Sequence, residues 1–153
     1  MPAEFAFTLN GQATTVRAEP AQSLLEILRD TCGLKATRLG CGLGQCGACT
    51  VLVDGEARHA CDTSMEAAAG HDITTLEGLG SRADPHPLQA AFVEEQALQC
   101  GYCTTGMLMC SAALLRRNPD PSEQEIRQAL DGNLCRCGVH NRIVRAVRKA
   151  ART

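Results

Sequence analysis

Residues 41–55 read CGLGQCGACTVLVDG, a glycine-rich stretch with three cysteines that leads directly into a short apolar run. Thiols this close together in a sequence belong to one of three arrangements: a disulfide framework, a zinc site or an iron–sulfur cluster. The choice among them decides the fold and the function, because each arrangement needs its own redox compartment and its own supporting structure.

Composition narrows this choice. The chain has 153 residues, of which 44% are hydrophobic and only 3% aromatic, with ten cysteines and a formal net charge of −2. With so few large side chains the hydrophobic cores are small, and we expect disulfides or bound metals to add to the stability of the fold. The small net charge gives no reason to expect a nucleic acid or an acidic lipid as a partner.

The sequence also bears on the compartment. The opening MPAEFAFTLNGQ lacks a basic segment followed by a long apolar one, and no window holds the ~18 consecutive apolar residues of a membrane span. We therefore expect no membrane segment in this chain and a cytoplasmic location, unless a partner exports or anchors the complex. In a reducing compartment disulfides are rare, and clustered cysteines usually bind metal.

The first half of the chain has strand patterns. Two hairpins are expected, at the Asn10-Gly11 and Asp54-Gly55 turns, because short alternating or β-branched runs flank each turn. Between them, Ser23 and Glu26 form a capping box that starts an apolar helix. A further strand over residues 73–76 would complete a small mixed sheet with one helix packed across it.

The second half has helical patterns. A breaker-rich stretch, LGSRADPHP at residues 79–87, separates the halves and predicts two domains, residues 1–78 and 79–153. The helices are predicted over residues 87–98, over residues 104–117, from the Ser122 cap to Gly132, and over residues 140–150. The second of these is apolar nearly all round and is expected to be buried. The predicted fold class is therefore α+β, a sheet domain followed by a four-helix bundle.

The first cysteine set has the spacing of an iron–sulfur site. Cys41, Cys46, Cys49 and Cys61 are separated by four, two and eleven residues, which is the plant-type ferredoxin pattern for a 2Fe–2S cluster. The intervening glycines permit positive φ and bring backbone N–H groups close to the sulfurs, where they stabilise the reduced cluster. A zinc site would need paired C-x2-C knuckles, which Cys41 and Cys46 do not form, and a disulfide framework leaves the glycines unexplained.

A second cysteine set follows in the helical half. Cys100 and Cys103 come at the start of the apolar helix, and Cys135 and Cys137 come just before the last helix. By spacing alone, a C-x2-C with a C-x-C suits zinc as well as a 2Fe–2S cluster. Either metal would join two helix junctions in a domain with a thin core. No histidine follows a cysteine by two residues, so a Rieske centre is not expected in either half.

The motifs CGLGQCGACTVLVDG, QCGYCTTGM and NLCRCG, in this order and at these separations, resemble the small iron–sulfur subunit of the molybdenum hydroxylase family, which includes xanthine oxidase and aldehyde oxidoreductase. The resemblance covers nearly the whole chain and includes both cysteine sets. It implies a plant-type ferredoxin-like β-grasp domain with one 2Fe–2S cluster and a four-helix domain with a second. The implied ligands are Cys41, Cys46, Cys49 and Cys61 for the first cluster and Cys100, Cys103, Cys135 and Cys137 for the second.

The same resemblance implies the partners. A separate large subunit would hold a molybdopterin-type molybdenum cofactor and the substrate, an aldehyde or an N-heterocycle, so this chain would have no catalytic residue of its own. Gln99 would hydrogen-bond the pterin, and Cys137 would lie beside it. Electrons would reach the helical-domain cluster first, then the Cys41 cluster, then an external acceptor. We therefore expect the second cluster to be buried toward the partner and the first to lie near the surface.

One departure from the family concerns the acceptor. Many flavin-linked relatives read CRCTGY where this chain reads CRCGVHNRI at residues 135–143, which favours a cytochrome over a FAD subunit. Two alternatives stay open at this point, a free-standing 2Fe–2S electron carrier or redox sensor and a zinc-stapled interaction module. The helical half argues against a simple carrier, which needs only one exposed cluster.

The remaining candidates have simpler interpretations. Cys32 and Cys110 lie outside both sets and are expected to be small packing residues. Basic residues gather on the last predicted helix, where a solvated face at the negative end of the helix dipole is the expected role. Arg136, between two predicted ligands, either offsets cluster charge or is a solvated loop residue.

Overall fold

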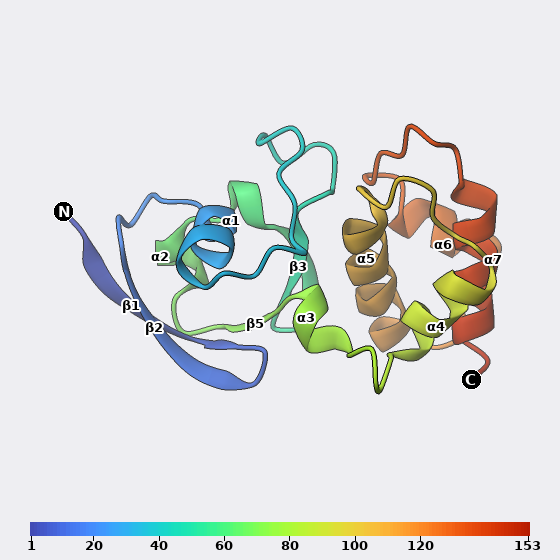
Figure 1. The fold of residues 1–153 in the computed structure, drawn as a ribbon, viewed down its shortest axis with the longest axis horizontal. Coiled ribbons are helices and arrows are strands. Elements are labelled where there is room, and N and C mark those ends of the chain that lie inside the picture. Colours follow the sequence, from blue (N-terminus) through green and yellow to red (C-terminus); the bar gives the residue numbers. More distant parts are fainter.

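The computed structural model describes residues 1–153 as a sheet unit and a helical unit lying side by side (Figure 1). The sheet unit contains β1 (Ala3–Leu9), β2 (Gln12–Ala18), β3 (Thr50–Val53), β4 (Glu56–His59) and β5 (Asp72–Thr74), in the order β2-β1-β5-β3-β4. β1 and β5 are parallel and the other neighbours are antiparallel. The sheet is therefore mixed, and the fold class is α+β as predicted.

The first hairpin and the first helix form where the sequence predicts them. Asn10 and Gly11 have φ of 50° and 79°, as a two-residue hairpin turn requires. The Ser23 hydroxyl accepts a hydrogen bond from the Glu26 N–H, and the Glu26 side chain accepts from the Ser23 N–H, which completes the capping box of α1 (Leu24–Glu26). The helix continues as a π-helical turn, η1 (Ile27–Thr31), and its apolar residues pack on the sheet with Phe7, Val16, Val51 and Ile73.

The helical unit is built around one buried helix. α5 (Thr104–Arg117) matches its predicted range and has ten buried residues, because α4 (Pro87–Glu94), α6 (Glu123–Ala129) and β3 all contact it. α7 (His140–Ala150) also matches its predicted range and packs along α4. Both helices therefore lie where their apolar patterns indicated.

Some boundaries differ from the predictions. α4 ends at Glu94 instead of residue 98, because Glu95 is its C-cap and Gln96 turns the chain with φ of 50°. α6 ends at Ala129, before Gly132. Three single turns were not predicted, since four residues or fewer carry no periodicity: η2 (Ala60–Asp62), α2 (Met65–Ala68) and α3 (Leu76–Leu79).

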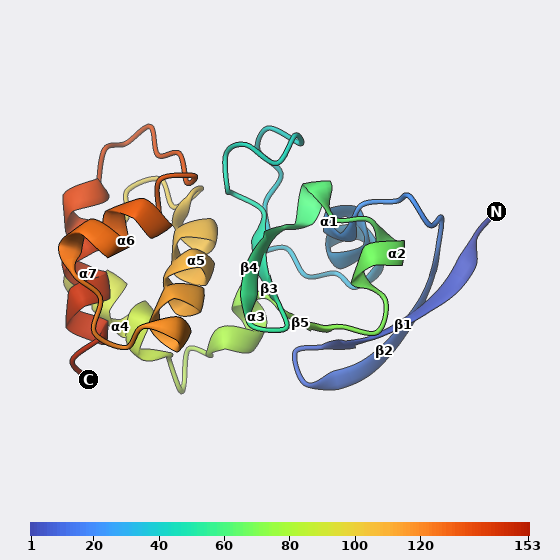
Figure 2. The same ribbon diagram turned by 180° about the vertical axis from the view of Figure 1, so that it is seen from behind.

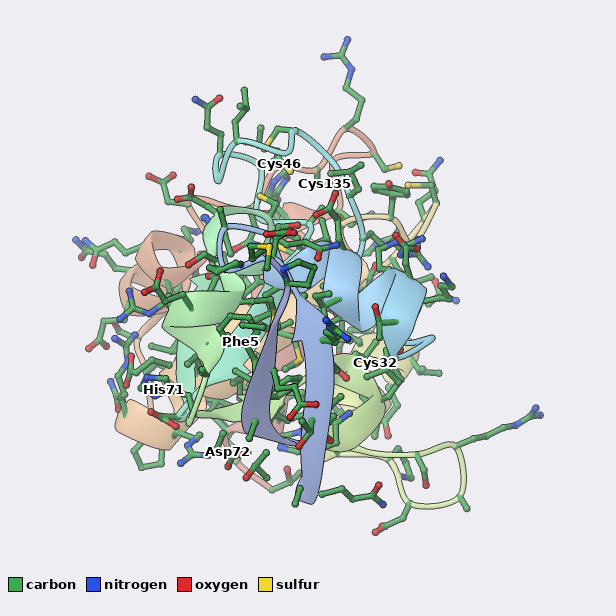
Figure 3. The ribbon with its side chains drawn as sticks, turned by 90° about the vertical axis from the view of Figure 1, so that its left-hand side faces the viewer. Phe5, Cys32, Cys46, His71, Asp72 and Cys135 are labelled. Atoms are coloured by element: carbon green, nitrogen blue, oxygen red, sulfur yellow. The ribbon has the colours of Figure 1, made fainter.

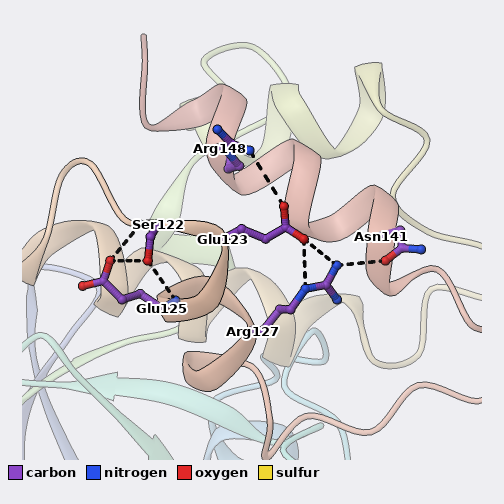
Figure 4. A network of polar contacts seen from close by, with 6 residues as sticks. All are labelled: Ser122, Glu123, Glu125, Arg127, Asn141 and Arg148. Carbon is purple, nitrogen blue, oxygen red and sulfur yellow. Dashed lines mark hydrogen bonds and ion pairs between the residues drawn. The ribbon is translucent and has the colours of Figure 1, made fainter.

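A polar network connects α6 with α7 (Figure 4). Glu123 accepts a 2.8 Å hydrogen bond from Arg127 and lies 3.9 Å from the Arg148 guanidinium, and Arg127 also donates to Asn141 at 3.1 Å. Exposed pairs of this kind contribute only about 0–1 kcal/mol each. The basic face of α7 is thus largely paired within the chain, because Arg145 contacts Glu95 and Lys149 contacts Glu94 as well.

β3 joins the two units, as the view from behind shows most clearly (Figure 2). Successive strand residues point to opposite faces, so Val51 enters the core under α1 while Thr50 and Leu52 face α5. Leu52 belongs to the core of the helical unit, and the Thr50 hydroxyl lies 3.8 Å from the Cys110 sulfur. Cys110 is buried here, in agreement with its predicted packing role.

Candidate metal centres

Both cysteine sets lie at the same end of the molecule. Cys46 and Cys135 are close together in the end-on view (Figure 3), and the backbone N–H of Leu134 donates a 3.0 Å hydrogen bond to the Cys46 carbonyl. A cavity of about 260 Å³ between the loops is lined by thiols of both sets: Cys41, Cys46, Cys100, Cys103 and Cys135. The fold thus brings together two cysteine sets that are separated in the sequence, the first ending at Cys61 and the second beginning at Cys100.

The first loop folds around its own sulfurs. The N–H groups of Leu43 and Gln45 each lie 3.3 Å from the Cys41 sulfur, and the Gly44 N–H lies 3.3 Å from the Cys61 sulfur. Gly42, Gly44 and Gly47 have φ of 65° to 75°, which turns these donors inward at little steric cost. Such N–H groups stabilise negative charge on sulfur, so the loop suits thiolate ligands.

The thiols in the first set differ sharply in their surroundings. Hydrogen bonds from the backbone N–H groups of Leu43, Gln45 and Cys46 lower the pKa of Cys41 to about 6. Burial instead raises the pKa of Cys49 to about 12. A bound metal cation deprotonates a coordinating thiol outright, so the buried Cys49 needs the positive charge that iron would bring.

The second set lies around the start of α5 and the loop before α7. The Tyr102 N–H lies 3.5 Å from the Cys100 sulfur, and the N–H groups of Val139 and Gly138 reach the Cys135 sulfur. Burial is the main cause that raises the pKa of Cys103 to about 12. This set therefore resembles the first in having an exposed thiol and inward N–H groups, but its most covered thiols are half-buried.

The geometry fits a two-iron cluster better than a single ion. In the first set the Cys41 N–H lies 3.3 Å from the Cys46 sulfur, and the Cys61 N–H lies 3.5 Å from the Cys49 sulfur. In the second set the Cys137 thiol helps to lower the pKa of Cys100, and the Cys135 thiol helps to raise that of Cys103. No cysteine is in a disulfide, so all eight thiols of the two sets are available as ligands. Tetrahedral zinc needs four ligands around one centre, whereas each iron of a 2Fe–2S cluster takes two protein ligands.

The expected difference in burial between the two sets is wrong for the isolated chain. Cys100 is exposed and Cys135 and Cys137 are half-buried, while Cys49 of the first set is fully buried. The sequence could not reveal these exposures, because burial of a loop side chain depends on packing between segments that are far apart in the sequence.

Gln99 and Cys137 share a polar cavity of about 330 Å³ with Gly138 and with four further residues of the last loop and α7. Gln99 is exposed and precedes the Cys100 ligand position, so its amide is free to donate and to accept. Two arginines, Arg142 and Arg145, also line this cavity. Cys137, a predicted cluster ligand, and Gln99, the predicted pterin contact, therefore line the same cavity.

Several residues at the junction of the two loops were not found from the sequence. Asn133 is buried and donates a 3.2 Å hydrogen bond to the Gly47 carbonyl, and Leu134 bonds to Cys46 as described above. Arg38 and Tyr102 meet across the same junction. These contacts depend on how the sheet unit packs against the helical unit, and no pattern within one short segment of sequence predicts them.

Arg136 lies between two members of the second set. It is exposed beside the cavity between the loops, and no acidic side chain lies within salt-bridge distance of it. Its charge is therefore not neutralised by a carboxylate of this chain.

Comparison with known proteins identifies both units. Residues 7–75 match the model of the 2Fe-2S iron-sulfur cluster binding domain, and residues 75–148 match that of the [2Fe-2S] binding domain. The chain therefore carries two 2Fe–2S-binding domains, in agreement with the donor sets described above.

Relatives match over the whole length. The chain is 54% identical to a subunit of the nicotinate dehydrogenase of Pseudomonas putida, covering 100% of this chain and 98% of that protein. It is 48% identical to the alpha subunit of the isoquinoline 1-oxidoreductase of Brevundimonas diminuta, covering 95% and 96%. The crystal structure of quinoline 2-oxidoreductase from Pseudomonas putida 86 superposes with a TM-score of 0.94 at 38% identity, covering 99% of this chain and 94% of that one.

A larger enzyme contains the same unit. The aldehyde oxidoreductase of Desulfovibrio desulfuricans superposes with a TM-score of 0.94 at 39% identity, covering 97% of this chain but only 17% of that one. The chain belongs to the small 2Fe–2S iron–sulfur subunits of the molybdenum hydroxylase family. It is an electron-transfer subunit of an oxidoreductase complex, as the sequence motifs indicated. No helix in the structure is long and apolar enough to cross a membrane.

Proposed function

We propose that the two cysteine sets are the cluster ligands and that electrons pass from the helical set to the sheet set. The ligands are Cys41, Cys46, Cys49 and Cys61 for one cluster and Cys100, Cys103, Cys135 and Cys137 for the other. The observation that carries this assignment is the ring of backbone N–H groups that lie 3.3 to 3.5 Å from the sulfurs of both sets. When bound, each cluster stores one electron, so two clusters in series carry the two electrons of a hydroxylation one at a time.

The residues of the chain connect the two sets directly. The Leu134 N–H donates to the Cys46 carbonyl, and Leu134 is covalently joined to Cys135. One hydrogen bond therefore links a ligand position of the sheet domain with a ligand position of the helical domain. Asn133 supports this link by donating to the neighbouring Gly47 carbonyl at 3.2 Å.

The large subunit holds the molybdopterin cofactor in this family, and we propose that it docks over the cavity of Gln99 and Cys137. An amide that both donates and accepts suits the edge of a heterocycle such as a pterin. The exposure of Gln99 and Cys100 supports this placement, because a partner chain would cover them. The Cys41 loop then faces the external acceptor.

The domain boundary, the substrate class, the electron acceptor and the compartment are proposed on separate grounds. We propose a domain boundary between residues 78 and 79, at the last residue of α3 and just before the turn-rich segment that leads to α4. We also propose that α4, α5, α6 and α7 form one four-helix bundle. The substrate of the complex is an N-heterocyclic carboxylate or a related N-heterocycle rather than an aldehyde, since the relatives with 54% and 48% identity are named for nicotinate and isoquinoline. A cytochrome is favoured over a FAD subunit as the electron acceptor. The complex is proposed to be cytoplasmic, unless a partner subunit directs it elsewhere.

The Gln99→Ala variant tests the docking site. Both clusters are expected to assemble, but substrate should reduce the helical-domain cluster more slowly in the complex, because a buried pterin group loses its partner at a cost of about 1–3 kcal/mol. Rapid-mixing spectroscopy that follows each cluster separately measures this. Gln128→Ala, an exposed glutamine on α6, is the matched control and should behave as wild type. Reduction of the Cys41 cluster before the other would reverse the proposed order.

A further inference from the structure

The two cysteine loops meet through a set of side-chain contacts that the relay itself does not require. Arg38 lies three residues before Cys41, and its Nη1 donates a 3.2 Å hydrogen bond to the Gly101 carbonyl. Its guanidinium carbon lies 5.2 Å from the centre of the Tyr102 ring, within the range of a cation–π interaction. The Tyr102 hydroxyl in turn donates to the Leu39 carbonyl.

These contacts join positions next to predicted ligands in both domains. Arg38 and Leu39 precede the first cysteine of the sheet set, while Gly101 and Tyr102 lie between Cys100 and Cys103. Gly101 has φ of 80°, which turns its carbonyl toward the other loop, and a residue with a side chain rarely adopts this conformation. The contacts therefore run directly from one cysteine loop to the other.

Little else fixes the loops at this end of the molecule. Leu52 enters the helical core farther down, and at the loops themselves Asn133 donates a 3.2 Å hydrogen bond to the Gly47 carbonyl. Near the cysteines, the apolar side chains Leu39, Leu43, Tyr102 and Leu134 are 54%, 70%, 47% and 64% exposed, so they contribute little packing. Polar and cation–π contacts must then help to set how far apart the loops lie, together with the hydrogen bonds of Leu134 to Cys46 and of Asn133 to Gly47.

We propose that Arg38 and Tyr102 form an interdomain clamp that sets the separation of the two cysteine loops, and so the electronic coupling between the clusters they hold. Both are positioning residues, since neither provides a ligand. The clamp rests on the proposed assignment of the eight cysteines. One electron moves between the clusters with no atom transferred, so the separation of the loops directly affects the rate, which falls steeply with distance.

The test uses the full chain with both clusters assembled and reduced by dithionite. Two paramagnetic centres split each other's signals by an amount that falls with the cube of their separation. The Arg38→Ala/Tyr102→Ala double variant is expected to lose or broaden this splitting, at unchanged iron and sulfide content, and to slow reduction of the Cys41 cluster in the complex. Tyr102→Phe keeps the ring and loses only the bond to Leu39, so a smaller change in splitting is expected.

Two further variants serve as controls for the splitting measurement, one conservative and one far from the clamp. Arg38→Lys keeps a cation over the ring and should recover much of the wild-type splitting, whereas Arg58→Ala, an exposed arginine on β4, should leave it unchanged. A wild-type splitting in the double variant with both clusters intact would overturn the clamp. If the double variant fails to assemble both clusters, the single variants decide: unchanged splitting in both Tyr102→Phe and Arg38→Gln, which removes the cation, would overturn the clamp. A wild-type chain with no second cluster signal would contradict the proposed function, not the clamp alone.

Discussion

Cys46→Ser and Cys103→Ser are each expected to remove one cluster and leave the other. Serine oxygen is a harder and more basic ligand than a thiolate, and it matches iron–sulfur chemistry poorly. Because the two sets have separate sulfurs and separate N–H donors, loss of one cluster should leave the other cluster assembled. The iron content should fall by about half in each variant, and each should lose a different one of the two reduced-state paramagnetic signals.

Cys110→Ala is the control for both variants. Cys110 is buried against Thr50 in the junction between α5 and β3, and it lies outside both sulfur sets. Its replacement removes one small buried atom and should leave both signals intact. Loss of a cluster in this variant, or retention of both clusters in Cys46→Ser, would show that the ligands are wrongly assigned.

Gly106→Ala is expected to destabilise the chain strongly, against the usual preference of helices for alanine. A Cβ at this position in α5 would lie 2.0 Å from the Gly47 carbonyl oxygen. That oxygen is held by hydrogen bonds from the Thr50 N–H, the Thr50 hydroxyl and the Asn133 amide at 3.2, 2.7 and 3.2 Å. The backbones must separate, so overpacking outweighs the roughly 0.5–1 kcal/mol gain in helix propensity.

The expected net loss is about 3 kcal/mol, which lowers the melting temperature by about 10 °C in a chain of this size. Thermal unfolding of the cluster-loaded chain measures it. Gly132→Ala is the matched control, because nothing lies within 4 Å of its added Cβ, and it should be neutral or slightly stabilising. Equal melting temperatures for the two variants would mean that the sheet and helical units are not packed as closely as described.

The sequence predicted those parts of the fold that have local causes. The Asn10-Gly11 turn, the Ser23 capping box and the apolar pattern of α5 each act within a few residues, and each appears as expected. The end of α4 was missed because Gln96 adopts a positive φ that its residue type does not favour. The single-turn helices were missed because they are shorter than any pattern that could reveal them.

The candidate site also has a part that the sequence predicts and a part that it does not. Cysteine spacing predicted two sets of four thiols, and the structure brings thiols of both sets to one cavity. Their role as cluster ligands stays a prediction. The way the two sets meet was not predictable. The Leu134 bond to Cys46, the buried Asn133 and the contact of Arg38 with Tyr102 arise from packing between units. The exposure of Cys100 could not be predicted either, because the partner that would cover it is a separate chain.

The metal and sulfide content of the anaerobically purified chain tests the central claim most directly. Two 2Fe–2S clusters predict roughly four irons and four acid-labile sulfides per chain, with no zinc. Two separate paramagnetic signals should appear on reduction. Iron for only one cluster in a fully loaded preparation, or stoichiometric zinc in the set of Cys100, Cys103, Cys135 and Cys137, would contradict the account.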